Sequence, residues 1–411
     1  MGGYRGNSGE PGTAAKVARL NAARWRRHRG LGAVLDALGA GEGLTRYVGG
    51  AVRDDLLGLP VNDVDLATQL RPEAVIERLK AAKLKAVPTG IEHGTITAVS
   101  EGQPFEVTSL RRDVSTDGRR AIVEYTDDWR EDAGRRDFTI NALMADPNSG
   151  EVFDYFGGLA DLAERRVRFI GNPLQRIAED HLRILRFFRF HARFGQGQPD
   201  AQALAACAER ANDLMALSRE RIADELLKLL AVEDPAGTVR IMIDRAILKP
   251  VVPEIERGAV QQLEQLIAAE RDAKIAPNPL RRLAALLPGE PSVAERIAVR
   301  LKLSKNARKR LSCAAARDLG TNPRALAYRV GTDCAVDRLL LAAKPEEAAI
   351  ILNWAIPRLP IGGGALIELG IPQGPGVAVA LRQIEDRWAD ADFPTGETFA
   401  RLVQEVINRR S

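Results

Sequence analysis

The sequence is poor in cysteine, and its three cysteines are widely spaced. Cys207, Cys313 and Cys334 include no C-x-x-C pair. This spacing argues against a disulfide framework and against a zinc site. We therefore expect a protein of a reducing compartment, the cytoplasm. An organellar matrix is the alternative, because the first thirty residues are rich in arginine and poor in acids.

Long apolar runs and internal repeats are also missing. No segment approaches the roughly 18 consecutive apolar residues that a membrane span needs. The start of the chain lacks the apolar segment of a secretory signal. No repeat with a period of about 20 to 50 residues is visible, which argues against a solenoid. The sequence predicts a soluble protein with no membrane partner.

Outside the first thirty residues, basic and acidic residues nearly balance, so the net charge is small. The chain has 59 Lys and Arg against 55 Asp and Glu, a formal charge of +4. Seven of the basic residues and one acid lie in residues 1–30, which carry +6, so the rest of the chain carries −2. We expect a frayed basic arm over 1–30 that adds non-specific attraction for an anionic partner. In the rest of the chain an anionic partner must be bound by local patches of basic residues.

Strand-like and helix-like patterns occupy different parts of the chain. Period-two or short apolar patterns predict strands at 45–48, 61–67, 85–87, 94–99 and 105–110. After Gly157-Gly158 the sequence changes to long amphipathic patterns typical of helices. The predicted fold class is α+β, with a small mixed-sheet head followed by an all-α remainder.

The first motif with chemical content is a glycine turn. Gly49 and Gly50 follow the strand at 45–48 and precede a predicted helix that carries Arg53. Glycines permit close backbone approach, helix-start amides are free to bind, and a guanidinium can grip a phosphate. The motif predicts an anion site, with an ordinary strand-to-helix turn as the alternative.

A pair of carboxylates follows the glycine turn. Asp63 and Asp65 are two residues apart on the predicted strand at 61–67, so they share a face. Two carboxylates on one face repel each other unless a divalent cation lies between them, and Mg²⁺ fits. Glu106, flanked by apolar residues on a later strand, would suit a third carboxylate of a two-metal centre. The alternatives are solvated strand faces.

Two arginines precede a segment that we expect to be helical. Arg135 and Arg136 could face an anion while Asp137 or Thr139 caps the helix. A solvated basic turn is the alternative.

An acid and an arginine at helical spacing suit base recognition. Asp180 and Arg183 are three residues apart and share a helix face. A carboxylate accepts from the exocyclic amine of cytosine or adenine, and a guanidinium donates to the ring nitrogen. Uracil and guanine present the opposite pattern and would be rejected. A salt-bridged helix surface is the alternative.

Taken in order, these pieces resemble the class II tRNA nucleotidyltransferases (CCA-adding enzymes) and bacterial poly(A) polymerases of the polymerase-β-like superfamily. The matching motifs are Gly49–Asp54 with Asp63 and Asp65, Arg135–Ala142, Asp154–Gly158 with Asp161-Leu162, Glu179-Asp180-x-x-Arg183 with Arg186 and Arg189, and Ser218–Ile222 with Glu225. They cover about residues 30–230. Two features depart from the family pattern: His181 stands where proline is usual, and a C-terminal H…HD hydrolase pattern is missing.

The resemblance implies a domain organisation and a set of residue roles. The implied domains are an arm (1–30), a nucleotidyltransferase head (31–150), a base-selecting neck (151–230), and an RNA-binding body (231–345) and tail (346–411). Asp63 and Asp65 resemble the Mg²⁺ ligands, and Glu106 the third catalytic carboxylate. The implied nucleotide-binding residues are Gly49, Gly50, Arg53, Arg136 or its neighbour Arg135, Asp180, Arg183, Arg186 and Arg189.

The implied reaction is template-independent addition of CCA to the 3′ end of tRNA from CTP and ATP, with release of pyrophosphate. Residues 88–97 resemble the CCA-adding form, because the Gly-Arg-Arg-Phe stretch of the poly(A) polymerases is missing there. The complete charged loop at 111–120 resembles that of enzymes able to switch from CTP to ATP. A poly(A) polymerase and a non-catalytic RNA-binding protein on the same scaffold remain the alternatives.

Overall fold

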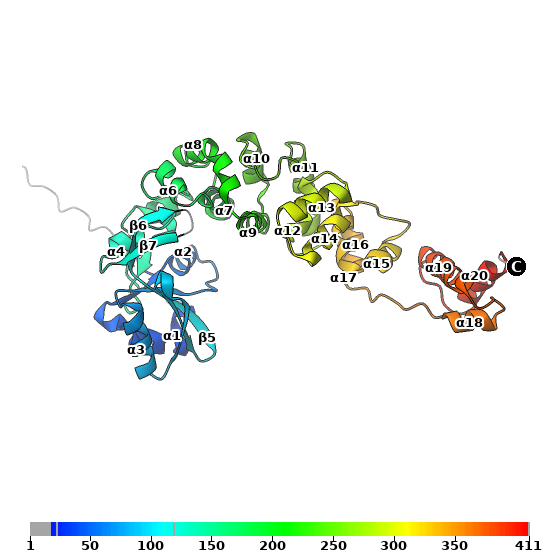
Figure 1. Cartoon of the computed structure of the whole chain (residues 1–411), viewed down its shortest axis with the longest axis horizontal. Coiled ribbons are helices and arrows are strands. Elements are labelled where there is room, and N and C mark those ends of the chain that lie inside the picture. Colours follow the sequence, from blue (N-terminus) through cyan, green and yellow to red (C-terminus); the bar gives the residue numbers. More distant parts are fainter. Residues whose placement is uncertain (1–17, 22–23, 118–119, 410–411) are drawn as a thin grey trace, which may run out of the picture. The chain divides into compact units, whose positions relative to one another are not determined.

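The chain folds into two compact units. The structure, a computed structural model, describes residues 18–21, 24–117 and 120–409. One unit contains the chain up to Arg183 together with Phe194–Ala206, and the other contains Ile184–Arg193 and the chain from Cys207 onward. In Figure 1 the strands that carry labels lie in the blue and cyan part of the chain together with several helices, and only helices are labelled from green to red. The division into arm, head, neck, body and tail stays a prediction.

The first unit is built on a seven-stranded mixed sheet of order β3-β4-β5-β2-β1-β8-β9. The strands are β1 (Thr45–Val48), β2 (Asp65–Thr68), β3 (Lys85–Gly90), β4 (Thr95–Ser100), β5 (Gln103–Ser109), β8 (Met144–Ala145) and β9 (Val152–Phe153). Two further strands, β6 (Arg111–Asp117) and β7 (Arg120–Tyr125), form a separate antiparallel hairpin. The segment at 111–120, expected as a loop, is therefore largely strand. Gly118 and Arg119 lie outside the described residues.

Helices make up the remainder, as predicted. The first unit contains α1 (Arg29–Ala37), α2 (Gly50–Leu56), α3 (Pro72–Ala81), α4 (Trp129–Gly134), α5 (Gly158–Ala163) and α6 (Pro173–Glu179), and both units share α7 (Arg183–Phe194) and α8 (Ala201–Glu209). The second unit continues with α9 (Arg219–Leu230), α10 (Ala236–Asp244), α11 (Ala259–Asp272), α12 (Pro279–Leu286), α13 (Pro291–Arg300), α14 (Lys305–Ala315), α15 (Pro323–Val330), α16 (Thr332–Leu341), α17 (Pro345–Leu352), α18 (Gly363–Glu368), α19 (Pro375–Asp390) and α20 (Gly396–Asn408). Within the described residues, every helix is too short or too polar to span a bilayer. The α+β class is confirmed.

Alternation along the strands decides which side of the sheet is open. Leu66 of β2, Val107 of β5 and Ile96 of β4 have no exposed surface, and α1 and α3 pack against β4. Side chains one position away point to the other face. That other face carries Asp65 and Glu106, both of which reach solvent. The apolar pattern thus leaves the acidic side of these strands free for chemistry.

The expectation of a frayed arm is wrong for the described residues 18–21 and 24–28. Leu20 is buried and its amide donates to the Gly150 carbonyl (2.8 Å). The indole Nε1 of Trp25 donates to a carboxylate oxygen of Asp55 on α2 (2.8 Å), and the Trp25 ring packs edge-on against Tyr47 (4.9 Å between centroids). These contacts outweigh the entropy of a free end. The more distal part of the arm, residues 1–17, lies outside the described residues.

We predict that Trp25→Ala lowers the free energy of unfolding of the first unit by about 2 kcal/mol, because the variant loses both ring packing and a hydrogen bond. Arg27→Ala, a change at an exposed neighbour, is the matched control and should stay near the wild type. Urea unfolding followed by far-ultraviolet circular dichroism, which reports backbone structure, measures the stability of both variants. Equal stability of the two variants would show that the contacts of Trp25 with Asp55 and Tyr47 do not stabilise the fold.

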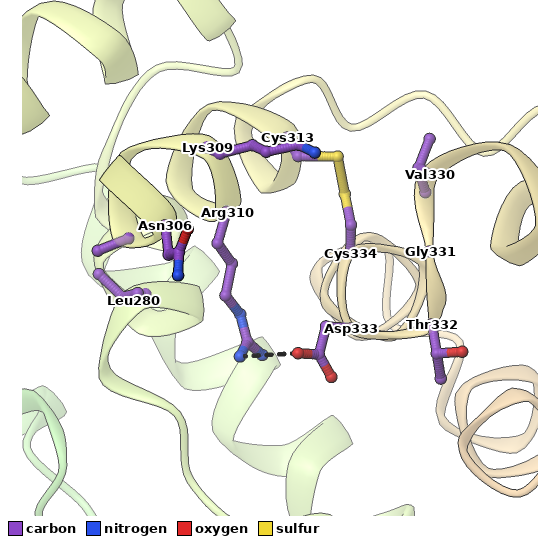
Figure 2. A pocket seen from close by; sticks show the side chains of 11 residues that line it. Leu280, Asn306, Lys309, Arg310, Cys313, Val330, Gly331, Thr332, Asp333 and Cys334 are labelled. Atoms are coloured by element: carbon purple, nitrogen blue, oxygen red, sulfur yellow. Dashed lines mark ion pairs between the residues drawn. A yellow bond between two sulfur atoms is a disulfide. The ribbon is translucent and has the colours of Figure 1, made fainter. Parts of the chain in front are cut away.

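The second unit corrects the expectation about cysteine. Cys313 on α14 and Cys334 on α16 form a disulfide, with their Cα atoms 6.1 Å apart (Figure 2). The pair lines a cavity of about 690 Å³ in which Arg310 points toward Asp333. Helix packing, rather than short sequence spacing, brings the two sulfurs together, so a search for C-x-x-C could not find them. Cys207 is free and buried, and burial raises the pKa of its thiol.

Candidate active site

The glycine turn begins beside an acidic side chain. β1 ends at Val48, which pairs with Asp65 on β2, so Gly49 starts the turn next to that carboxylate. Gly49 has φ +65°, a conformation that favours glycine. A Cβ atom on Gly49 would lie 3.3 Å from a guanidinium nitrogen of Arg136. Glycine is therefore required both for the turn and for the approach of this arginine.

The register between β2 and β5 places two carboxylates in one row. Asp65 on β2 lies opposite Glu106 on β5 in a parallel pair. Asp63 precedes β2 and lies in a loop, which corrects the expectation that Asp63 and Asp65 share one strand. Glu106 lies on a strand, as predicted. The sheet brings Asp65 and Glu106 together although they are far apart in sequence.

The electrostatics of Asp65 show the proximity of these acids. Packing around its carboxyl raises the pKa of Asp65, and the negative charges of Glu106 and Asp63 raise it further, while Arg136 opposes the shift. Like charges held this close favour a bound cation. Within the described part of the chain, no group of three or more acidic, histidine or cysteine side chains is already arranged as a metal site.

A buried acid that the sequence reasoning missed holds both arginines. Asp132 on α4 has only 1% of its surface exposed and pairs with Arg135 (Nε to Oδ1, 2.9 Å) and Arg136 (Nη2 to Oδ2, 3.2 Å). Burial alone would raise the pKa of Asp132, but the two guanidinium groups outweigh it and lower the pKa. The signal was present in the sequence, since Asp132 lies three and four residues before the arginines.

The segment after the arginines is not the expected α-helix. Arg135 ends α4, and only a short 3₁₀ turn over Thr139–Asn141 follows. Asp137 accepts hydrogen bonds from the Phe138 amide and the Asn141 side chain, both at 2.9 Å. These local bonds take the place of a helix cap and hold the Thr139–Asn141 turn next to Gly49.

The motif at 154–158 supports this turn. The carboxylate of Asp154 accepts hydrogen bonds from the backbone amides of Gly158 and Leu159, both at 2.9 Å. A Cβ atom on Gly158 would lie 2.3 Å from the carbonyl oxygen of Thr139. Gly158 is needed for this close approach, and the motif positions the Thr139–Asn141 turn.

Arg53 lies inside the head rather than at an open surface. It is 6% exposed, donates to Asn141 Oδ1 (2.5 Å) and to Asp54 Oδ1 (2.8 Å), and stacks over the Phe194 ring (4.1 Å). In this arrangement it braces α2 against the Thr139–Asn141 turn. Its predicted contact with a phosphate stays a prediction.

Asp180 and Arg183 lie at a junction between helices and not on one continuous helix. α6 ends at Glu179 and α7 begins at Arg183. Asp180 accepts from the Leu182 amide (3.1 Å). Arg183 donates to Glu179, to the Arg176 carbonyl (2.9 Å) and to the Arg135 carbonyl (3.2 Å). The expected helical spacing is wrong here, but the junction ties Arg183 to the arginine pair.

Arg186 and Arg189 lie further along α7, where they have an acidic partner in the second unit. Arg189 pairs with Glu225 of α9 (Nε to Oε2, 2.7 Å), and Arg186 lies 3.7 Å from the other oxygen of the same carboxylate. Both guanidinium groups also lie over the Phe190 ring. These contacts stabilise α7 against α9, and the nucleotide-binding role of Arg186 and Arg189 stays a prediction.

We predict that Asp132→Asn weakens both stability and nucleotide use. Loss of a buried carboxylate that two arginines share should lower the free energy of unfolding by about 2 kcal/mol at pH 7 and raise KM for CTP, the substrate that the sequence resemblance implies, by about tenfold. Because the folded-state pKa of Asp132 is lowered, its stabilisation is present above its unfolded value and is lost as pH falls through the folded value.

Urea unfolding at pH 7 and below pH 4 measures this effect. The stability gap between wild type and Asp132→Asn should narrow in acid. Glu131→Gln, which changes an exposed acid on the same helix, is the matched control and should behave as wild type. A gap that is unchanged across the pH range would contradict the assigned role of Asp132.

Comparison with known proteins agrees with this geometry. Residues 45–168 match the family model described as "Poly A polymerase head domain", and residues 198–258 match the one described as "Probable RNA and SrmB- binding site of polymerase A". The fold and the site thus define a nucleotidyltransferase with a polymerase-type head.

Two curated relatives and one solved structure are similar over most of the chain. The mitochondrial CCA tRNA nucleotidyltransferase 1 of Mus musculus is 34% identical, over 85% of this chain and 83% of the mouse protein. The CCA-adding enzyme of Streptococcus gordonii is 32% identical, over 85% of this chain and 90% of that protein. The Bacillus stearothermophilus CCA-adding enzyme in complex with CTP matches with a TM-score of 0.74 and 26% identity, over 93% of this chain and 99% of that one. The chain belongs to the family of CCA-adding tRNA nucleotidyltransferases.

Proposed function

We propose that the protein adds CCA to the 3′ end of tRNA, using CTP and then ATP and releasing pyrophosphate. The observation that carries this proposal is the placement of Asp65 and Glu106 in one row beside an arginine-lined glycine turn, in a chain of this family. The relatives that support the substrates are named CCA tRNA nucleotidyltransferases, and the Bacillus stearothermophilus enzyme is described with CTP bound.

The acidic row would hold divalent cations. Enzymes of this type generally use divalent metals. Asp65 and Glu106 supply adjacent carboxylates on the open face, and Asp63 approaches from the preceding loop. We assign Mg²⁺ in a two-metal arrangement to these three residues. When bound, it would supply Lewis-acid charge at the reacting phosphate and favour the ionised form of the attacking hydroxyl.

The arginine beside the glycine turn would bind the triphosphate. Both arginines pair with Asp132, but Arg136 also lies against Gly49, whereas the carbonyl of Arg135 accepts from Arg183. We therefore assign the triphosphate contact to Arg136, with the backbone of Gly49 and Gly50 beside it. Positive charge there offsets the charge that accumulates on pyrophosphate as it leaves.

Base selection is assigned to Asp180 and Arg183. A carboxylate that accepts from an exocyclic amine and a guanidinium that donates to a ring nitrogen fit cytosine and adenine alike. Arg183 uses three of its five N–H groups on Glu179 and two carbonyls, which leaves two for a base edge. The surrounding bonds hold the guanidinium in place before the nucleotide arrives.

Product analysis tests the function directly. The protein is incubated with tRNA that lacks its 3′ end, together with CTP and ATP, and the product is sequenced. Addition of CCA and nothing further is the expected result. A long tract of A would instead identify a poly(A) polymerase, an activity that the names of the relatives do not favour. A product unchanged in length would contradict the proposal. The cellular compartment stays a prediction.

A further inference from the structure

The row of carboxylates continues into a row of hydroxyl groups. Glu106 on β5 lies opposite Thr97 on β4, and two pairs further along Thr108 lies opposite Thr95. Directly opposite residues point to the same face of a sheet and have Cβ atoms about 4.5 to 5.5 Å apart. Thr97 is therefore the next side chain beyond Glu106 on the open face. It is partly exposed, unlike Ile96 beside it, which is buried.

A bulge adds a second hydroxyl to this row. The pairing of β3 with β4 shifts between Val87 and Gly90, so two residues of β3 oppose one of β4. The hydroxyl of the exposed Thr89 thereby lies 2.8 Å from that of Thr97. Bulges near active sites commonly redirect a side chain. A hydroxyl has one donor and two acceptor positions, so a pair joined by one bond keeps further capacity for a ligand.

The order of the strands separates two sides of the site. β5 and β2, which carry the carboxylates, lie between β1 on one side and β4 and β3 on the other. The glycine turn and Arg136 lie on the β1 side, and the threonines lie on the β4 side. In phosphoryl transfer the attacking and leaving oxygens are roughly in line on opposite sides of the phosphorus. If pyrophosphate leaves toward Arg136, the attacking 3′-hydroxyl arrives from the side of Thr97.

We propose that Thr97 and Thr89 bind the terminal ribose of the acceptor RNA through its 2′-hydroxyl. The inference rests on the proposed tRNA-end activity. The 2′-hydroxyl is adjacent to the attacking 3′-hydroxyl, so it lies beside Glu106 when the 3′-hydroxyl is in place. An uncharged hydroxyl pair suits a ribose hydroxyl better than a phosphate, and the 2′-hydroxyl distinguishes RNA from DNA. Thr97 and Thr89 thus select an RNA end and orient its 3′-oxygen.

The test crosses a protein change with a substrate change. Thr97→Val removes the hydroxyl and keeps the branched shape, while Thr97→Ser keeps the hydroxyl and serves as control. Each protein is given tRNA acceptors that end in a ribose or in a 2′-deoxyribose, and kcat/KM for the acceptor is measured at saturating CTP. The wild type and Thr97→Ser should prefer the ribose end by about tenfold, the effect of one hydrogen bond. Thr97→Val should lose this preference, with KM for CTP unchanged.

The outcomes separate this inference from the function on which it rests. A wild type that adds no C or A to tRNA contradicts the proposed function itself. CCA addition without any ribose preference in the wild type overturns the inference alone, and so does a Thr97→Val enzyme that keeps the full preference. Thr89→Val provides a second variant if Thr97→Val unfolds, which circular dichroism would show, and it should reduce the preference in the same direction.

Discussion

Replacing Asp65 by asparagine should reduce nucleotide addition by at least about a thousandfold, because the proposed metal site would lose a negative ligand worth several kcal/mol to the transition state. Asp65 lies beside both Glu106 and the glycine turn, so its carboxylate is central to the row. Asparagine keeps the size of the side chain but removes its charge and replaces one acceptor oxygen by an NH2 donor. Single-turnover incorporation of CTP into tRNA measures the effect.

Binding of tRNA separates loss of chemistry from loss of fold. The Asp65→Asn variant should bind tRNA with a Kd within about threefold of the wild type, since the change removes a negative charge next to a polyanion. Asp36→Asn, at an exposed acid of α1, is the matched control and should retain full activity. Incorporation by Asp65→Asn at more than a tenth of the wild-type rate would refute the assignment of the metal ligands.

Local sequence patterns predicted the parts of the site that depend on single strands. The strand at 45–48 was predicted with its exact bounds, and Glu106 lies on a strand as expected. Alternation of apolar residues is a local property, so it survives in any fold that buries one face. The α+β class followed from the same patterns.

Contacts between distant segments do not follow from local patterns, and the expected grouping of Glu106 with Asp63 and Asp65 rested on their fitness as metal ligands and on the family resemblance. The pairing of Asp65 with Glu106 requires β2 and β5 to become neighbours, although 41 positions separate these two residues in the sequence. The disulfide between Cys313 and Cys334 depends likewise on the packing of α14 against α16. Short-range patterns carry no information about such pairings.

The prediction of one helix through Asp180 and Arg183 was wrong for a different reason. The periodicity through Asp180 and Arg183 suggested one helix, but the Leu182 amide bonds to the Asp180 side chain, so the backbone breaks between Glu179 and Arg183. Aspartate competes for backbone amides in this way. The break lets Arg183 reach the Arg135 carbonyl, which belongs to neither α6 nor α7.

Replacing Arg183 by alanine should relax base selection by about 10- to 100-fold, because a good contact between a side chain and a base edge contributes about 1 to 3 kcal/mol of discrimination. The wild type should incorporate C and A and reject U and G, since only C and A present an acceptor nitrogen to the guanidinium. The measurement is the ratio of kcat/KM for CTP to that for UTP in the first addition step.

Arg183 also anchors the junction, so its loss must be separated from a general loosening of α6 and α7. Arg176 offers the matched control, because it donates to Glu179 and to the Gly134 carbonyl (2.9 Å) but has no assigned contact with the base. Arg176→Ala should lose stability and keep the preference for CTP over UTP. Asp180→Ala should instead lose the preference, because the acceptor for the exocyclic amine is removed while the bonds of Arg183 remain. Equal selectivity in Arg183→Ala and Arg176→Ala would show that Arg183 supports the junction without reading the base.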